Sequence, residues 1–393
     1  MEGKSIKVSA PGKVIIHGEH SVLYGKTALA VALGLRSTVA IKELPPTDDP
    51  KIHVEFPNVG LHEKLSLKAV FDLFSITSGD NPQDWTRPEE LDHDVHLRKV
   101  DEALRKVRPA FDDLPSNQKS SLRGFLYAFG GIFASSSRIA DLSVSVTTDL
   151  TVGAGTGSSA SFAVCLCGAM VQLVKLKSAG RVTDFSPEER RIVSAWAFNC
   201  EKITHGAPSG IDNTTCTYGS LVSFKKGEEP LLLSSPEFRI LLVDSRVGRE
   251  TSKLVASVAA LRSRNRAAVD HIMDAVDHVA VTAAALLEKL SRTKSSTDID
   301  VIYEQLNELW GMNHCLLAAL GVSHPALEAI RSAASGRGLA CKLTGAGGGG
   351  NAIVLIPPST EEAKVEELKA ELLNGGFRVT DTLVGGAGIQ NHE

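Results

Sequence analysis

Gly153-Ala-Gly155-Thr-Gly157-Ser158-Ser159-Ala160, followed directly by an apolar segment, is the most informative stretch of this chain. Its alternating glycines allow positive φ angles and let backbone N–H groups approach a ligand closely. The two serines precede a predicted helix over residues 161–175. A helix N-terminus attracts phosphate, and a hydroxyl beside bound phosphate can reach Mg²⁺. The stretch therefore favours a nucleotide-phosphate site, with a flexible loop before a core helix as the alternative.

This loop does not follow the common nucleotide-binding patterns. A P-loop requires Lys and then Ser or Thr after its last glycine, whereas the next lysine here is Lys175. The third glycine comes one residue too early for the dinucleotide pattern G-x-G-x-x-G. The chain also lacks the H-R-D and D-F-G triplets of protein kinases. Any phosphate site here must therefore be of another type.

Length and composition limit the class of protein. The 393 residues, 43% of them hydrophobic, predict two domains or one large domain. The net charge of −4 gives no sign of binding to nucleic acid or to a membrane. The 6 cysteines include no C-x-x-C pair, which favours a reducing compartment without a disulfide framework or zinc site.

Targeting signals are also lacking. No apolar run reaches the ~18 residues of a membrane span, and the first ten residues lack a signal-peptide core. We therefore expect a cytoplasmic protein. The absence of a C-terminal S-K-L signal does not by itself exclude a peroxisomal location.

Periodicity and breakers predict alternating strands and helices. Residues 6–10 and 14–17 predict two strands around a Pro11-Gly12 turn, and residues 78–120 predict a partly helical surface insertion. Ser186, Pro187 and Glu189 form a capping box that begins a helix ending near His205. Further strands are predicted at 28–40, 142–148, 236–244, 352–356 and 377–384, and further helices at 255–292, 302–320 and 359–374.

Two polar segments lie outside the glycine loop. In the first, Lys13 opens a strand, and Glu19 and His20 leave its other end. A solvated lysine and an ordinary turn are the simpler interpretation, because short motifs often match by chance. The second, residues 208–213, is a tight polar turn. Asp212 is either a local hydrogen-bonding group there or a general base for a substrate hydroxyl.

Glu201 lies inside a predicted helix on a face of small residues. At 100° per residue, Ala197 lies within about 40° of it and Ser194 within about 20°. An unpaired buried carboxylate is costly, so Glu201 needs a partner. A metal ion, Arg190 or a helix cap would each serve.

A second glycine cluster spans residues 345–350, directly after Lys342-Leu-Thr. So many glycines lose much backbone entropy on folding, and a simple turn would not need them. We therefore expect this backbone to approach a ligand or the first glycine loop closely.

Together these segments resemble the GHMP kinases, the superfamily of galactokinase, homoserine kinase, mevalonate kinase and phosphomevalonate kinase. Its three motifs match residues 11–25, 153–160 and 342–350 in the same order. Within the superfamily the chain is most similar to animal mevalonate kinases, nearly end to end but weakly over 60–120 and 260–300. The matching residues include Ala10-Pro-Gly-Lys-Val-Ile-Ile-His-Gly-Glu-His20, Phe56-Pro-Asn58, Trp196-Ala-Phe, Glu201 and His205-Gly-Ala-Pro-Ser-Gly-Ile-Asp-Asn213.

The resemblance implies an α/β (α+β) protein of two domains with the active site in the cleft between them. Residues 1–226, joined by the tail 382–393, would form an N-terminal domain like ribosomal protein S5. Residues 227–381 would form a ferredoxin-like C-terminal domain. The implied reaction transfers the γ-phosphoryl group of ATP to the 5-hydroxyl of (R)-mevalonate, an early step toward isoprenoids and sterols.

The resemblance also implies a role for each matching residue. Asp212 would take the hydroxyl proton, with Lys13 beside it to neutralise charge, and Ser159 and Glu201 would hold Mg²⁺. Mevalonate would contact Glu19, His20, Ser209, Thr251 and Ala346. ATP would contact Lys13, Asn58, Thr148, Gly153, Ala154, Gly155, Thr156, Gly157, Ser158 and Ser159. Such a site fits phosphoryl transfer, which depends on positioning and charge neutralisation.

The sequence departs from mevalonate kinases around the loop. They usually carry two prolines where Thr151-Val152 stand, a leucine at the position of Thr156 and an aromatic hydroxyl at that of Phe162. Because proline fixes φ, we expect a more flexible loop entry and weaker ATP binding, with the chemistry intact.

Two alternatives remain from the sequence. Another GHMP kinase acting on a phosphorylated substrate would need more basic groups in its pocket than Glu19-His20 offers. A ligand sensor without catalysis would not need both Lys13 and Asp212. The resemblance also implies a homodimer, and it suggests inhibition by prenyl diphosphates at the ATP site. The sequence settles neither, nor the role of the 60–120 insertion.

Overall fold

The computed structural model describes residues 5–75, 84–133 and 141–392 of the chain. The strands in these residues are β1 (Ser5–His17), β2 (Ala28–Glu43), β3 (Lys51–Phe56), β4 (Leu61–Ser66), β5 (Leu142–Thr148), β6 (Leu221–Phe224), β7 (Leu231–Leu233), β8 (Phe238–Asp244), β9 (Cys341–Leu343), β10 (Asn351–Ile356), β11 (Arg378–Val384) and β12 (Gln390–His392). The α-helices are α1 (Leu67–Ser75), α2 (His93–Val107), α3 (Ser116–Phe133), α4 (Ser158–Ala179), α5 (Pro187–His205), α6 (Ile211–Tyr218), α7 (Thr251–Arg264), α8 (Arg266–Arg292), α9 (Ser296–Ala319), α10 (Pro325–Ser335) and α11 (Glu362–Asn374).

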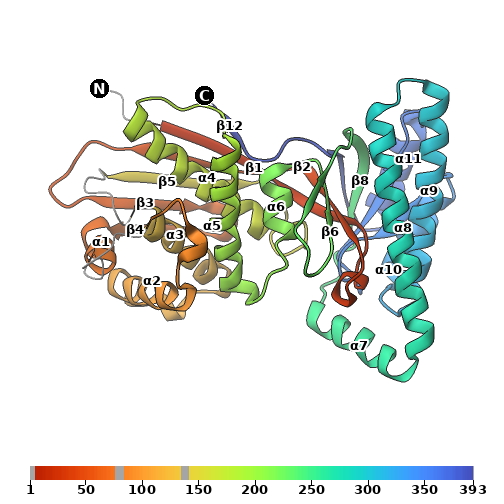
Figure 1. The fold of residues 1–393 in the computed structure, drawn as a ribbon, viewed down its shortest axis with the longest axis horizontal. Helices are drawn as coiled ribbons and strands as arrows, with labels where there is room; N and C mark the ends of the chain where they lie inside the picture. Colours follow the sequence, from red (N-terminus) through yellow and green to blue (C-terminus); the bar gives the residue numbers. More distant parts are fainter. Residues whose placement is uncertain (1–4, 76–83, 134–140, 393) are drawn as a thin grey trace.

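Strand β2 connects the two halves of the molecule. Along its length it pairs antiparallel with β1, while its second half pairs with β5 and its first residues pair with β6. Leu33, near its middle, pairs with Val384 of β11, so the sheet continues as β4-β3-β5-β2-β11-β8-β10-β9. β1 and β2 extend from one half toward the other in Figure 1. The two halves therefore share one twisted sheet.

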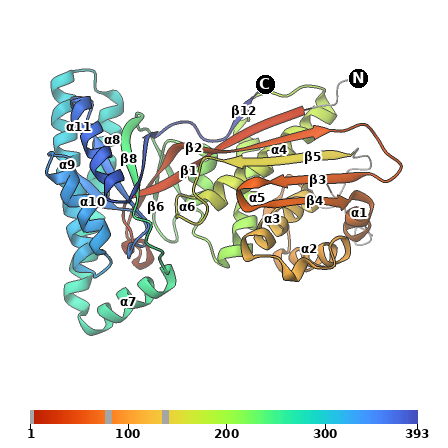
Figure 2. The same cartoon turned by 180° about the vertical axis from the view of Figure 1, so that it is seen from behind.

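In the N-terminal half, helices cover one face of the sheet. Helix α4 packs on β1 and β2, and α3, α5 and α6 pack around it. Figure 2 views this sheet from the side opposite to the helices. Buried side chains such as Val8, Phe129 and Trp196 fill the space between the layers. Ser186 accepts from the Glu189 N–H and Glu189 accepts from the Ser186 N–H, which confirms the predicted capping box of α5.

The C-terminal half is a four-stranded antiparallel layer of β11, β8, β10 and β9. Helices α8 and α9 form a long pair beside it, with α10 and α11 completing the layer (Figure 1). The chain then returns, because β12 pairs with β1 through Lys7 and His392. The first and last described strands, β1 and β12, thus both lie in the N-terminal half. The predicted domain limits at 226, 227 and 381 stay a prediction.

Some local predictions were wrong. Residues 5–17 form one strand rather than two, because β2 pairs on both sides of Pro11 and a register shift between Pro11 and Lys13 absorbs the proline. The predicted 255–292 helix is two helices that break at Asn265. The polar turn at 208–213 continues into α6, whose first turn contains Asp212. Within the 78–120 insertion, residues 78–83 lie outside the described residues.

Helix α4 is the centre of the N-terminal core. By length and composition alone it is apolar enough to cross a membrane, with a mean hydropathy of 1.6. However, 72% of that window is buried inside the protein. Its apolar residues are therefore explained by packing against β1, β2 and α5.

Two helical glycines give a matched test of this packing. A Cβ on Gly131 of α3 would lie 2.1 Å from Cη2 of Trp196, whereas one on Gly311 of α9 would meet nothing within 4 Å. We expect Gly131→Ala to lower the free energy of unfolding by about 1–3 kcal/mol, because the rigid indole cannot move aside. Gly311→Ala should raise it by about 0.5–1 kcal/mol through helix propensity. Urea titration measures both; equal effects would contradict this account of the α3–α5 contact.

Candidate active site

The glycine loop connects the end of β5 to the start of α4. Gly153, Gly155 and Gly157 all have positive φ angles, between 73° and 80°. The Lys13 backbone N–H donates to the Thr156 carbonyl at 2.9 Å, which ties the loop to β1. A Cβ on Gly157 would lie 2.8 Å from Cγ of Lys13. Glycine is therefore required at this position both for conformation and for the approach of the lysine.

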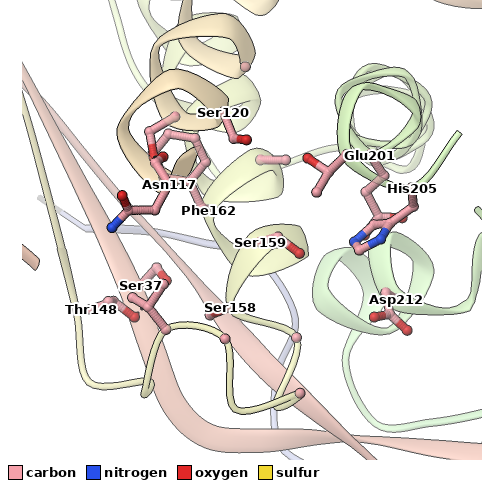
Figure 3. A pocket seen from close by; sticks show the side chains of 18 of the residues that line it. Ser37, Asn117, Ser120, Thr148, Ser158, Ser159, Phe162, Glu201, His205 and Asp212 are labelled. Carbon is pink, nitrogen blue, oxygen red and sulfur yellow. Dashed lines mark hydrogen bonds between the residues drawn. The ribbon is translucent and has the colours of Figure 1, made fainter. Parts of the chain in front are cut away.

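Beside the loop lies a cavity of about 800 Å³ lined from both halves of the molecule. Figure 3 shows Asn117, Ser120 and Phe162 toward one end, and Glu201 and Asp212 toward the other, with Ser158 and Ser159 between. Predicted site residues in its wall are Lys13, Asn58, Thr148, Gly153, Gly155, Gly157, Ser158, Ser159, Glu201, Asp212, Thr251 and Ala346. The structure thus gathers most of the predicted residues around one space.

Lys13 and Asp212 form an ion pair at the cavity wall. Lys13 Nζ lies 3.0 Å from Oδ1 of Asp212, and their side chains are 10% and 31% exposed. Lys13 projects from β1, while Asp212 belongs to the first turn of α6. Gly210, with φ 86°, is the N-cap residue of this helix. A carboxylate with a partly buried cation beside it can accept a proton from a hydroxyl in the cavity and stabilise the charge that develops there.

Glu201 is a buried carboxylate without a hydrogen bond in the part of the chain that the structure describes. Burial raises its pKa to about 8; the charge of Asp212 acts in the same direction, and Lys13 acts against both. Arg190, one partner considered from the sequence, instead donates to the Thr217 and Ile389 carbonyls. Arg190 is therefore not the partner of Glu201.

The few protein oxygens available here suit Mg²⁺ better than a cation that takes all of its ligands from the protein. Among the described residues there is no group of three or more His, Cys, Asp or Glu side chains that could hold a metal ion. Mg²⁺ typically uses one or two protein ligands and completes its shell with water and substrate phosphate. The Glu201 carboxylate and the exposed Ser159 hydroxyl in the same cavity fit that pattern.

Glu19 and His20 lie next to the site but do not line the cavity. Glu19 forms an ion pair with Lys342 in which both side chains are fully buried, and Asn313 donates to it at 3.0 Å. His20 Nε2 is 2.8 Å from the Ala346 carbonyl. The Ser209 hydroxyl accepts from the Ile211 N–H at 3.4 Å and also lies outside the cavity wall. Their roles as substrate contacts stay predictions.

Asn58 and Thr148 fix the strand end next to the loop. The Asn58 amide exchanges two hydrogen bonds, each 3.1 Å, with the backbone of Thr148. The Thr148 hydroxyl accepts from Ser37, which also accepts from Ser161 of α4. Asn58 and Thr148, which are predicted to contact the nucleotide, therefore also connect the end of β5 to the start of α4.

Sequence reasoning missed two cations. Arg249 follows β8, lines the cavity and donates to the Ala154 carbonyl at 3.2 Å. Its only sequence signal is its position after Gly248 in a polar segment. Lys342 belongs to the third motif, but its full burial against Glu19 depends on the meeting of β9 with the end of β1, which no local pattern reveals.

The comparisons agree with this architecture. Residues 123–220 match the family model of the GHMP kinases N terminal domain, and residues 283–374 match that of GHMP kinases C terminal. The shared sheet, the glycine loop and the Lys13–Asp212 pair at the cavity define a two-domain kinase of the GHMP class.

Relatives narrow the class further. The chain is 34% identical to the mevalonate kinase of Mus musculus, an alignment that covers 100% of this chain and 96% of that protein. It is 32% identical to the mevalonate kinase of Arabidopsis thaliana, covering 98% and 99%. This chain belongs to the mevalonate kinase family.

Solved structures share the fold at lower sequence identity. The mevalonate kinase of Methanococcus jannaschii matches with a TM-score of 0.68 and 22% identity over 96% of this chain and 98% of that one. That of L. major, in complex with R-mevalonate, matches with a TM-score of 0.65 and 21% identity over 98% of each. At this identity they support the fold alone.

The buried Glu201 predicts an unusual pH dependence of stability. Its pKa lies near 8 in the folded protein and near the ordinary 4.5 in the unfolded chain. Between these values the unfolded chain loses a proton that the folded protein keeps, so rising pH favours unfolding. Without added metal, Glu201→Gln should therefore gain stability over the wild type as pH rises from 5 to 8, on the order of a few kcal/mol. Urea titrations at several pH values measure this difference.

Glu188→Gln is the matched control, because Glu188 is an exposed residue of the same helix and Arg191 lowers its pKa. It should show no such gain. If the difference in the free energy of unfolding between Glu201→Gln and the wild type does not change with pH, the pKa of Glu201 is not raised.

Proposed function

We infer that this protein is an ATP-dependent mevalonate kinase, which transfers the γ-phosphoryl group of ATP to the 5-hydroxyl of (R)-mevalonate. The observation that carries this conclusion is the Lys13–Asp212 pair in the wall of the cavity that the glycine loop borders. Full-length similarity to mevalonate kinases at about one third identity supports the choice of substrate. The product would be 5-phosphomevalonate, a precursor of isoprenoids and sterols.

The two substrates would bind at different ends of the cavity. The N–H groups and glycines of residues 153–159 would hold the phosphates at the start of α4, where the helix dipole favours negative charge. Phe162, Asn117 and Ser120 lie at the far end, where the nucleoside would extend. The acceptor hydroxyl would therefore lie near Asp212.

Asp212 would accept the proton of the acceptor hydroxyl as the new O–P bond forms. Lys13, 3.0 Å from Asp212, would stabilise charge on the attacking oxygen and on the transferred group. The low exposure of Lys13 strengthens this effect, because water screens a partly buried cation less. The protein supplies orientation and charge rather than a covalent intermediate.

We further propose that Ser159 and Glu201 hold Mg²⁺ when Mg-ATP binds. The ion would neutralise phosphate charge and provide the cation that buried Glu201 lacks. Asp212 would remain the base, because Lys13 already pairs with it.

An ADP-release assay with Mg-ATP tests the proposed function. (R)-Mevalonate, phosphomevalonate, galactose and homoserine should be compared as acceptors at equal concentration. Turnover on mevalonate at least a hundredfold above the others supports the conclusion. A different preferred acceptor would assign another small-molecule kinase activity, and no turnover with any acceptor would favour a non-catalytic binding protein.

Asp212→Asn tests the proposed base. We expect kcat to fall by about 10²–10⁴-fold, because the amide cannot accept the proton. The dissociation constant for Mg-ATP and the melting temperature should change little. Asp184→Asn, at an exposed position before α5, is the control and should retain full turnover. Retention of kcat within a few-fold in Asp212→Asn would exclude Asp212 as the base.

Glu201→Gln tests the proposed metal ligand at fixed ATP concentration. The neutral amide binds Mg²⁺ more weakly than a carboxylate, so the Mg²⁺ concentration for half-maximal activity should rise about tenfold or more. Glu188→Gln again serves as the control. An unchanged Mg²⁺ requirement in Glu201→Gln would remove Glu201 from the metal site.

The cavity also supports the proposal that prenyl diphosphates compete with ATP. Its polar loop would take the diphosphate, and Phe56, Val59, Val146 and Phe162 provide an apolar wall for the prenyl chain. A homodimer, implied by the family resemblance, and a cytoplasmic location, expected from the sequence, complete the proposal. Inhibition kinetics with farnesyl diphosphate, and light scattering of the purified protein, address the first two points.

A further inference from the structure

The glycine loop is attached to the C-terminal half by side chains that the proposed function leaves without a role. The Ala154 carbonyl accepts two hydrogen bonds, from Asn351 Nδ2 at 2.8 Å and from Arg249 Nη2 at 3.2 Å. Three residues earlier, the Thr151 hydroxyl accepts from Arg378 Nη1 at 3.2 Å. All three donors come from the C-terminal sheet or the segment that leaves it.

Asn351 and Arg378 occupy one row of that sheet. Asn351 begins β10 and Arg378 begins β11, and both pair in register with Asp244 at the end of β8. Their side chains therefore leave the same sheet end, toward the loop. Asn351 is only 3% exposed, so its hydrogen bond to Ala154 is shielded from water on the donor side. Arg378 and Thr151 are both exposed.

Arg249 cannot fix the loop alone. Its guanidinium passes so close to Gly155 that a Cβ there would lie 1.4 Å from Nη2, and it also contacts Gly345 and Gly350. Because it lines the cavity, phosphate oxygens would compete with the Ala154 carbonyl for its donors. Asn351 faces no such competition, since it is absent from the cavity wall.

We propose that Asn351 and Arg378 form a clamp that positions the glycine loop for the phosphates of ATP. Asn351 holds the loop at Ala154 and Arg378 holds its entry at Thr151. The hydrogen bond from Arg378 restricts the loop entry at Thr151, where no proline fixes φ. The inference rests on the proposed function, since the loop must bind ATP for its position to matter.

The clamp predicts a loss confined to nucleotide binding. Asn351→Asp is nearly isosteric, but its carboxylate cannot donate and repels the Ala154 carbonyl. We expect the dissociation constant for Mg-ATP, measured by displacement of a fluorescent ATP analogue, to rise roughly tenfold. The KM for ATP should rise in parallel, while kcat at saturating ATP and the KM for mevalonate stay within about twofold, the split expected of a positioning residue.

Asn199→Asp is the matched control. Asn199 is also buried and donates to a backbone carbonyl, that of Pro88 at 2.8 Å, but outside the loop. It should lose stability without weakening Mg-ATP binding. Equal effects of the two variants on the dissociation constant, or no effect of Asn351→Asp, would overturn the role of Asn351.

A second set of variants tests Arg378 even if Asn351→Asp fails to fold. Arg378→Ala and Thr151→Val should each weaken Mg-ATP binding about threefold, and the double variant should be no weaker than either single one. In a Thr151→Pro/Val152→Pro background, Arg378→Ala should have no further effect. Arg98→Ala, an exposed arginine on α2, is the control. Additive losses in the double variant would exclude the Arg378–Thr151 contact.

The two inferences fail in different ways. A wild type that binds Mg-ATP but does not phosphorylate mevalonate would refute the proposed substrate, while the clamp variants would still report on the loop. Turnover of mevalonate with unchanged Mg-ATP affinity in all clamp variants would refute the clamp alone. A wild type that does not bind Mg-ATP would overturn both.

Discussion

The close approach of two cations to glycines of the phosphate loop is the constraint on which this site depends. Lys13 lies against Gly157 and Arg249 against Gly155, at distances that a Cβ would occupy. Any other residue at these positions would push the cations away and disfavour the positive φ angles as well. The glycines thus serve the protein's own cations as much as the ligand: they let Lys13 and Arg249 reach the position where phosphate charge would collect.

The two carboxylates of the site differ in how their charge is compensated. Lys13 pairs with Asp212, whereas Glu201 is buried beside them and has a raised pKa, so its ionised form is disfavoured. Replacing Asp212 and Glu201 by neutral groups would remove this unfavourable charge. It would also remove the groups proposed to act in phosphoryl transfer. A carboxylate whose pKa is raised by burial and by a neighbouring like charge is typical of a functional site.

The sequence predicted those parts whose causes are local. β5, the capping box of α5 and the existence of the glycine loop follow from alternation, capping chemistry and backbone freedom. Pro11 was misassigned as a turn, because the partner strand that keeps it extended lies in β2. Arg249 and Asn351 reach Ala154 only after distant segments meet, and the burial of Glu19 against Lys342 likewise depends on contacts between distant segments. Motif order could identify the family, but not which side chains hold the motifs together.

Strand β2 joins the two halves through its backbone. It pairs with β5 at one end and with β11 near its middle, so backbone pairing connects the halves independently of side-chain contacts. The side-chain contacts at Ala154, Thr151 and Glu19 therefore need not hold the domains together. They are left to adjust the loop and the His20 turn relative to the C-terminal sheet. A substitution that removes the Thr151 hydroxyl should accordingly be tolerated by the fold and change ligand binding instead.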